Sequence, residues 1–513
     1  MTEVTAPTTP DIVLPESHSH AAGAGVIKPG YDPRLANEDL APLKEQSWTW
    51  YNFFAFWMSD VHSVGGYLTA GSLFALGLVA WQVLIALLVG ITIVYFLCNL
   101  VARPSQRTGT PYPVASRIPF GVLGANIPAI IRGLIAVAWY GIQTYLASAS
   151  LIVVALKLDS GLAPWADVDT HGFLGLSALG WLGFGVMWIL QAVVFWRGME
   201  AIKKFIDFCG PAVYLTMFLL AAYLVYKAGW SNLHFNLGDK TLTGGTALKE
   251  TIIATVLVVS YFSGPMLNYG DFARYGKTFN QVKRGNFLGL PVNFLVFAIL
   301  VVVTAAATRP VFGKVLTDPV ETVARLDNTF AVVLGALTFM VATIGINIVA
   351  NFVSPAFDFS NVSPQRISWR AGGMIAAIGS VLITPWNLYN SPDTIHYTLD
   401  VLGAFIGPLY GVLIADYYLI KRQQVDVDEL YTLKPTGRYY YYKGYNPVAV
   451  IATAVSAIVG VFIVFYASSD VAAFSWFIGA GISFALYLAL KNRIPASAPA
   501  DASVEAPTEA SAS

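Results

Sequence analysis

The hydrophobic positions of this chain are gathered into long runs that contain few charges and are separated by short polar connections. A run of about 20 apolar residues is long enough for a helix to cross a lipid bilayer. The runs predict helices at residues 49–78, 80–102, 121–156, 172–195, 204–226, 250–268, 286–308, 328–353, 368–388, 397–420, 446–467 and 470–490. The pattern therefore predicts an all-α integral membrane protein with twelve transmembrane helices.

The two ends of the chain lack this pattern. Residues 1–46 are rich in Pro, Ala, Asp and Glu, and residues 491–513 are rich in Ala, Ser, Pro and Glu. Segments of this composition bury too little apolar surface to offset the loss of chain entropy on folding. We expect both ends to be disordered tails.

The first apolar run holds polar residues at its centre. Asp60 and His62 lie there, followed by the pair Gly65 and Gly66. An ionisable group at membrane depth costs roughly 2.5–3.5 kcal/mol on insertion scales, so it usually faces a cavity, a partner or a substrate path. The pattern indicates either a helix that is broken for function or polar contacts between packed helices.

A second interruption occurs five helices later. The sixth predicted helix contains Ser263-Gly-Pro265 and ends in Asn268-Tyr-Gly-Asp271. Transporters often repeat a bundle of helices, and an odd number of helices per repeat inverts the second copy. We therefore predict a five-plus-five inverted repeat in which helices 1 and 6 are broken and two C-terminal helices are added. The predicted boundaries are 47–226 and 247–421 for the repeats and 446–490 for the added helices.

Composition supports the membrane assignment. Of the 513 residues, 56 % are hydrophobic and only 12 % are charged, which is too little polar surface to cover a soluble globule. Lys plus Arg and Asp plus Glu both number 30, so the net charge suggests no nucleic-acid partner. Most Lys and Arg residues in the connections follow even-numbered helices. By the positive-inside rule, both termini are expected in the cytoplasm.

Candidate binding residues recur at helical spacing. Trp139 and Gln143 are four residues apart in the third helix, and Asn347 and Asn351 are four apart in the eighth. Residues at this spacing share one face of a helix. An indole ring with amides that both donate and accept hydrogen bonds suits a flat heterocycle with amide or ureide edges. Alternatively, Trp139 packs in the core and the amides join helices.

Several segments occur in the order found in one transporter family. They are the Trp-x-Ser-Asp segment of the first helix, Ser116-Arg-Ile-Pro-Phe120, Trp139-Tyr-Gly-Ile-Gln-Thr144, Asp271-Phe-Ala-Arg274, Ala342-Thr-Ile-Gly-Ile-Asn-Ile-Val-Ala-Asn351 and Gly407-Pro-Leu-Tyr-Gly through Ala415-Asp-Tyr-Tyr-Leu. Together they resemble the nucleobase:cation symporter-1 family, in particular bacterial permeases for uracil, cytosine, allantoin and hydantoin. This resemblance implies the LeuT-type fold of amino-acid transporters and a location in the inner (plasma) membrane.

The resemblance also implies a substrate site. It places Trp139 on one face of the ring, with Gln143 and Asn351 hydrogen-bonding the ring edges. Phe262 takes the place of a second aromatic residue, which is Trp in the hydantoin transporter. Ser63 takes the place of a glutamine. The pocket is therefore expected to differ in shape, and the identity of the substrate does not transfer.

The family's sodium site corresponds to Ser59, His62, Ala342, Gly345 and Ile346. The resemblance implies carbonyl ligands at the first three positions and hydroxyl ligands at the last two. Neither Gly345 nor Ile346 has a hydroxyl, and sodium needs several oxygen ligands. Sodium coupling is therefore in doubt, and Asp60 becomes a candidate proton carrier.

Other functional classes are less well supported. His171, His234 and His396 are isolated, so no metal cluster of a membrane enzyme is indicated. Gly276-Lys-Thr278 resembles the end of a phosphate-binding loop, but the required preceding glycine is Asp271. We expect a secondary active transporter that imports a nucleobase or related heterocycle, needs no cofactor beyond a coupling proton or sodium ion, and contacts the lipid bilayer. A passive channel or a nutrient sensor for the same solutes remains an alternative, and the oligomeric state is open.

Overall fold

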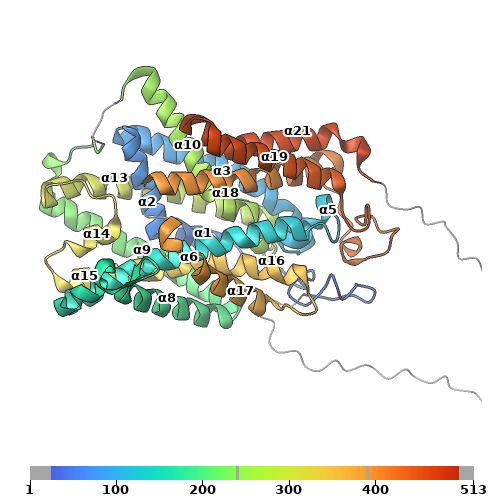
Figure 1. Cartoon of the computed structure of the whole chain (residues 1–513), viewed down its shortest axis with the longest axis horizontal. Coiled ribbons are helices and arrows are strands. Elements are labelled where there is room, and N and C mark those ends of the chain that lie inside the picture. The colour runs from blue at the N-terminus through green and yellow to red at the C-terminus, as the bar shows by residue number, and fades with distance from the viewer. Residues whose placement is uncertain (1–24, 239–241, 389–391, 496–513) are drawn as a thin grey trace, which may run out of the picture.

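The computed structural model describes residues 25–238, 242–388 and 392–495. Its main helices run roughly side by side along the long axis of the molecule (Figure 1). The first and the last described segments of the chain lie at the same end of this bundle. The described structure is almost entirely helical, as the hydrophobic runs predict.

The long helices follow the predicted order. They are α1 (Trp50–Val61), α2 (Val64–Ser72), α3 (Ala80–Thr108), α6 (Asn126–Leu158), α8 (Ala178–Trp196), α9 (Met199–Ala228), α10 (Gly244–Leu267), α12 (Phe279–Phe287), α13 (Asn293–Phe312), α15 (Thr329–Ile346), α16 (Ser354–Val362), α17 (Trp369–Leu382), α18 (Pro392–Ile414), α19 (Pro447–Tyr466) and α21 (Ser475–Ala489).

Short elements connect them. They are the helices α4 (Tyr112–Ala115), α5 (Arg117–Phe120), α7 (Val168–His171), α11 (Gly270–Ala273), α14 (Pro319–Ala324) and α20 (Ser469–Ala472), and the antiparallel strands β1 (Gly172–Phe173) and β2 (Leu176–Ser177). Single 3-10 turns are η1 (Leu73–Leu76), η2 (Ser160–Ala166), η3 (Trp230–Asn232), η6 (Pro385–Leu388), η8 (Asp428–Tyr431) and η9 (Lys491–Arg493), and π-helical segments are η4 (Leu288–Val292), η5 (Asn347–Val353) and η7 (Ala415–Ile420).

Within the described residues, nine helices are long and apolar enough to cross a membrane. Three shorter apolar helices accompany them, at Val64–Leu76, Trp369–Leu382 and Ser475–Ala489. Large apolar side chains such as Leu182 and Phe462 are mostly exposed, as expected for surfaces that face lipid. The membrane assignment is supported, whereas the count of twelve crossings and the repeat boundaries stay predictions.

The first helix is broken where the polar residues predict it. Helix α1 ends at Val61 and α2 begins at Val64. The hydroxyl of Ser63 accepts a hydrogen bond from the N–H of Gly66 at 3.0 Å, which caps the new helix start. A β-carbon on Gly66 would lie 2.6 Å from the carbonyl oxygen of Val61, so the break depends on glycine there.

The interruption of the sixth helix lies later than predicted. Helix α10 continues through Ser263-Gly-Pro265 to Leu267, and the break falls at Asn268 and Tyr269 before α11. Pro265 lacks one backbone hydrogen-bond donor, but it lies close to the end of α10. The last turn of α10 therefore still forms. Near this bend, the carbonyl of Gly264 accepts a hydrogen bond from Nε of Arg132 at 3.3 Å.

The prediction of a disordered N-terminal tail was wrong for residues 25–46. Leu35 and Leu40 are buried, and the backbone of this segment is held by other parts of the chain. Arg117 donates to the carbonyl of Leu35, and Arg274 donates to the carbonyls of Asp39 and Ala41. Composition does not reveal such contacts, because backbone carbonyls are present in every sequence. Residues 1–24 of this tail, and residues 496–513 of the C-terminal one, lie outside the described residues.

Candidate functional site

One cavity lies among α1, α6, α10 and the continuous helix formed by α15, η5 and α16. It is lined by Asp60, Trp139, Gln143, Tyr261, Phe262, Pro265, Ile346, Ala350 and Asn351. The structure therefore brings together six residues that sequence analysis had singled out from four separate helices.

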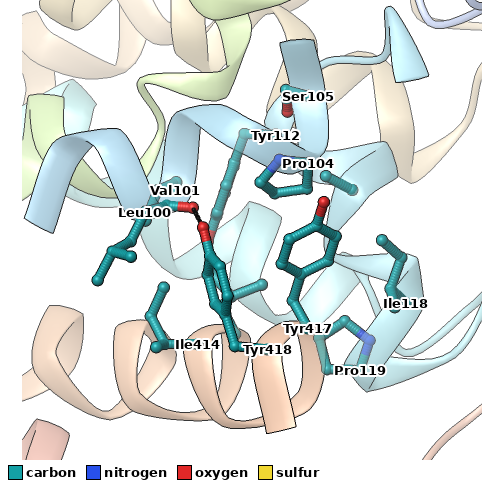
Figure 2. Close-up of a pocket in the computed structure, with 12 residues that line it drawn as sticks. Leu100, Val101, Pro104, Ser105, Tyr112, Ile118, Pro119, Ile414, Tyr417 and Tyr418 are labelled. Carbon is teal, nitrogen blue, oxygen red and sulfur yellow. Dashed lines mark hydrogen bonds between the residues drawn. The ribbon is translucent and has the colours of Figure 1, made fainter. Parts of the chain in front are cut away.

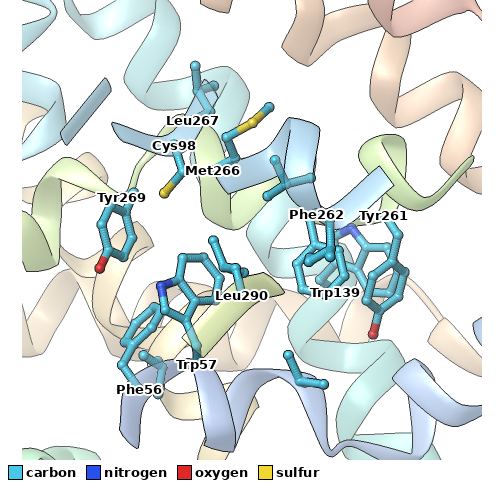
Figure 3. Close-up of a cluster of buried hydrophobic side chains, with 14 of the residues drawn as sticks. Phe56, Trp57, Cys98, Trp139, Tyr261, Phe262, Met266, Leu267, Tyr269 and Leu290 are labelled. Carbon is cyan, nitrogen blue, oxygen red and sulfur yellow. The ribbon is translucent and has the colours of Figure 1, made fainter. Parts of the chain in front are cut away.

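Aromatic rings form one side of this cavity. Trp139, Tyr261 and Phe262 lie close together (Figure 3). The rings of Trp139 and Tyr261 meet edge to face with centroids 5.6 Å apart, and Tyr261 and Phe262 do so at 5.1 Å. Such contacts fix ring orientations. Tyr261 was missed by sequence analysis, although its position next to Phe262 is a signal that could have found it.

Gln143 supplies an amide at the cavity. Its side chain is 1 % exposed, and its Oε1 has no hydrogen-bond partner in the described structure. A buried acceptor without a partner costs about 1–3 kcal/mol. A bound molecule with an N–H group at this position would remove that cost.

Asn351 is oriented by a chain of side-chain amides. It donates to Oδ1 of Asn347 at 3.0 Å, and Asn347 in turn donates to Oγ1 of Thr144 at 3.0 Å and Oε1 of Gln191 at 2.5 Å. Both asparagines belong to η5, and a π-helical segment inside a helix often marks a functional site. Asn347 is thus a positioning residue, and Asn351 is the one that reaches the cavity.

Asp60 is the acidic residue among those that line the cavity. It is 1 % exposed, and its Oδ1 has no hydrogen-bond partner among the described residues. An ionised carboxylate in such surroundings is costly unless it is paired. Asp60 is therefore suited to take up a proton or to accept a hydrogen bond from a bound molecule.

Two of the positions expected at a sodium site, Ser59 and His62, lie at the break of the first helix, and Gly345 lies opposite Ser59 on α15. Ser59 faces Gly345, since a β-carbon on Gly345 would lie 3.5 Å from Cβ of Ser59. The hydroxyl of Ser59 is 3.4 Å from the carbonyl of Ile206, and Nδ1 of His62 lies 3.1 Å from the hydroxyl of Tyr67. Among the described residues, no group of three or more His, Cys, Asp or Glu side chains could hold a metal ion.

Three further predicted residues have other surroundings. Ala342 is buried in α15, and Ile346 lines the cavity with an apolar side chain. Ser63 is not among the residues that line the cavity, and its hydroxyl caps α2. The first-helix break is therefore close to the cavity, but Ser63 has a local structural role.

A second cavity lies elsewhere, between α3, the α4–α5 turn and the end of α18 (Figure 2). Apolar side chains such as Val101 and Ile414 make up most of its lining, and Tyr418 donates to the carbonyl of Leu100 at 2.9 Å. It contains none of the residues that sequence analysis named as candidates for substrate binding or cation coupling. The cavity at Trp139 is therefore the better candidate for a polar heterocycle.

Comparison with known proteins identifies the family of the chain. Residues 41–482 match the family described as permease for cytosine/purines, uracil, thiamine and allantoin. The chain is 34 % identical over 479 residues to an allantoin permease of Bacillus subtilis (strain 168). This alignment covers 92 % of this chain and 96 % of the relative. It is 31 % identical over 461 residues to a purine-uracil permease of Arabidopsis thaliana, covering 86 % of this chain and 76 % of the relative.

The fold also matches a solved structure. A nucleobase-cation-symport-1 family transporter, in a closed conformation with bromovinylhydantoin bound, superposes with a TM-score of 0.73. The match covers 90 % of this chain and 96 % of the other at 22 % identity. The LeuT-type helical architecture is therefore shared. This chain belongs to the family of permeases for cytosine and purines, uracil, thiamine and allantoin, and it is a multi-pass membrane transporter.

Proposed function

We propose that this protein imports a heterocycle with amide or ureide edges, of the class that includes allantoin, uracil, cytosine and hydantoin. Transport would proceed by symport with a cation and by alternating access to the cavity. The observation that carries the proposal is the convergence of Trp139, Gln143 and Asn351 on one cavity. The relatives named for allantoin and uracil support this class of substrate.

Each cavity residue has a defined task in this proposal. Trp139 stacks on the flat ring, while Phe262 and Tyr261 restrict its tilt. Oε1 of Gln143 accepts a hydrogen bond from a ring N–H, and the amide of Asn351 meets the opposite edge. These are the functions that a ureide or a nucleobase requires, and a purely apolar ring would leave the amides unpaired.

The proposed coupling ion is a proton carried by Asp60. Gly345 and Ile346 lack the hydroxyl oxygens that would help to replace the hydration shell of sodium. Asp60 lies at the cavity with an unpaired oxygen, so substrate and proton could be held side by side. The alternative is a sodium ion held by backbone carbonyls and water at the end of α1.

The orientation follows from charge. Lys and Arg residues are concentrated in the connections that lie on the side of both termini, and the positive-inside rule places this side in the cytoplasm. We therefore propose that the protein lies in the plasma membrane with residues 25–48 and 421–446 on its inner surface.

Uptake assays test the function. Cells that lack their own permeases and express this protein should accumulate labelled allantoin, uracil, cytosine or hydantoin above the external concentration, and excess unlabelled substrate should compete. Trp139→Ala at equal surface expression is the negative control. Equilibration without accumulation would indicate a passive channel, and binding without uptake would indicate a sensor. Absence of both binding and uptake for all four solutes would refute the proposed substrate class.

A further inference from the structure

A second buried polar cluster lies next to the cavity, toward the end of the bundle that carries both termini. Arg132 precedes Trp139 by seven residues on α6, which is two helical turns along one face and roughly 10 Å. Asp358 on α16 follows Asn351 on η5 by seven residues along one continuous helix. Asp271 lies on α11, just after the break of the sixth helix. All three side chains are 0 % exposed.

The two carboxyl groups of this cluster have few partners. Oδ1 of Asp271 accepts a hydrogen bond from the backbone N–H of Tyr112 at 2.8 Å. Its Oδ2 has no hydrogen-bond partner within the described structure. Neither oxygen of Asp358 has a hydrogen-bond partner, and Nη1 of Arg132 is likewise unpaired within the described structure. The cluster thus contains buried polar atoms that lack hydrogen-bond partners within the described structure.

Electrostatics disfavour two negative charges here. Asp358 and Asp271 repel each other, and Arg132 attracts both. Burial raises the pKa of Asp271, which lies outside the membrane-spanning helices. Two neighbouring carboxylates in a dry site do not both ionise easily, so such a pair can hold one proton between them.

The surrounding groups limit what else could bind. Arg132 faces the pair from α6 and Tyr112 from α4, while Ser354 approaches Asp271 from α16. Arg274, next to Asp271, points its guanidinium at the carbonyls of Gly109, Asp39 and Ala41. A metal cation would be repelled by the Arg132 guanidinium, whereas a proton needs only one of the free carboxylate oxygens.

The cluster also touches the walls of the cavity. Arg132 donates to the carbonyl of Gly264, which precedes the lining residue Pro265, and to the carbonyl of the lining residue Ala350 at 3.1 Å. A change in the charge of the cluster would therefore act on two helices that enclose the substrate. Separation of α11 from α16, as the inner side opens, would admit water to both carboxyl groups.

From this arrangement we infer that Asp271 and Asp358 form a proton-binding site separate from Asp60, which holds one proton while the inner side is closed and releases it when that side opens. The inference rests on the proposed symport. When one of the two carboxyl groups is protonated, the pair carries one negative charge. The positive charge of Arg132 balances it, so this cluster needs no further ion in the closed state.

Infrared spectroscopy tests the site without any transported solute. Purified protein in liposomes is titrated with acid and base, and difference spectra are taken between wild type and the variants Asp358→Asn and Asp271→Asn. We expect the carbonyl-stretch band of a buried protonated carboxyl group to be lost in both variants. Asp428→Asn is the control, because the Asp428 carboxylate is exposed and is paired with Lys28 at 2.7 Å, so its removal should leave this band unchanged. Difference spectra that show no such band for either cluster variant would overturn the inference, because the band of Asp60 is common to wild type and variants and cancels in the difference.

A transport assay gives the second readout. Proteoliposomes that contain Asp358→Asn should keep exchange of labelled for unlabelled allantoin within about twofold of wild type. They should lose at least about tenfold of the accumulation that a pH gradient drives. Undiminished accumulation, or a band that disappears on addition of sodium at fixed pH, would contradict proton binding at this pair. If wild type does not transport allantoin, the proposed substrate class fails, but the infrared result still decides the proton site.

Discussion

Gly65 and Gln143 approach each other so closely that a β-carbon on Gly65 would lie 2.8 Å from Nε2 of Gln143. The broken first helix thus presents bare backbone to the side chain that we assign to the substrate edge. Because real β-carbons essentially never come this close to another atom, any larger residue at position 65 must displace the amide. The second half of the broken helix and the substrate-binding amide therefore form one structural unit.

Gly65→Ala should consequently weaken substrate binding by roughly tenfold, since the displaced amide loses a hydrogen bond worth ~0.5–1.5 kcal/mol. The Michaelis constant of uptake measures this effect. Gly185→Ala provides the control, because a β-carbon at position 185 would meet no atom within 4 Å. If both variants bound equally well, Gln143 would not be held by the helix break.

Removal of any one of the three main pocket side chains should weaken substrate binding. Loss of a ring stack costs ~0.5–1.5 kcal/mol beyond area burial, and an unpaired buried edge costs ~1–3 kcal/mol. We expect Trp139→Ala, Gln143→Leu and Asn351→Leu to raise the dissociation constant by roughly tenfold or more. Isothermal titration with purified protein measures it, and Trp81→Ala, at a side chain 61 % exposed, serves as control. Unchanged affinity in all three would exclude this site.

Asp60→Asn should separate binding from coupling. The amide keeps the shape of the carboxyl group but cannot carry a proton, so substrate exchange is retained while accumulation is lost. Replacing external sodium with choline should leave the initial uptake rate of wild type nearly unchanged, and collapse of the pH gradient should abolish accumulation. A steep dependence on sodium at fixed pH and membrane potential would count against the proton.

Gly345→Ser should make transport more dependent on sodium. The new β-carbon would lie 3.5 Å from Cβ of Ser59, which is an ordinary contact, so the side chain fits. Its hydroxyl would add one oxygen ligand beside the end of α1. The measurement is the initial uptake rate at increasing sodium concentration, compared with Gly345→Ala, which adds the bulk without the oxygen. A sodium response equal in the two variants would show that the hydroxyl is not a ligand.

Arg117→Met should destabilise the packing of residues 25–46 against the helical bundle. Arg117 is fully buried and donates to the carbonyls of Leu35 and Leu430 and to Oδ1 of Asn361. Each acceptor left unpaired costs ~1–3 kcal/mol. A clear drop in thermal unfolding temperature is expected, with the exposed Arg107→Met as control. Equal unfolding temperatures would mean that water replaces the guanidinium.

Hydrophobic spacing was enough to predict the helices and the break at Asp60, because bilayer length and the cost of a buried charge act locally along the chain. Helical spacing and family resemblance together selected Trp139, Gln143 and Asn351, which the structure brings to one cavity. Long-range relationships were not predictable. The cluster of Arg132, Asp271 and Asp358 draws on three separate helices, and no periodic pattern relates them.

The location of the sixth-helix break was also missed. Pro265 is the obvious helix breaker, yet α10 continues for two residues beyond it. Proline removes one donor but does not dictate where a helix ends when neighbouring groups satisfy the freed carbonyls. The π-helical segment at Asn347 likewise leaves no mark in the hydrophobic pattern.

The ordered segment at residues 25–48 bears on how the protein is made. The N–H of Asp32 bonds to the carbonyl of Tyr431, and Lys28 bonds to Asp428, a partner 400 residues later in the chain. At a synthesis rate of ~5–20 residues per second, the segment waits on the order of 20–80 s after leaving the ribosome before this partner exists. The contacts of residues 25–48 with Asp428 and Tyr431 are therefore completed among the last steps of biogenesis, and a chain that stops before residue 428 leaves its N-terminal segment without these partners.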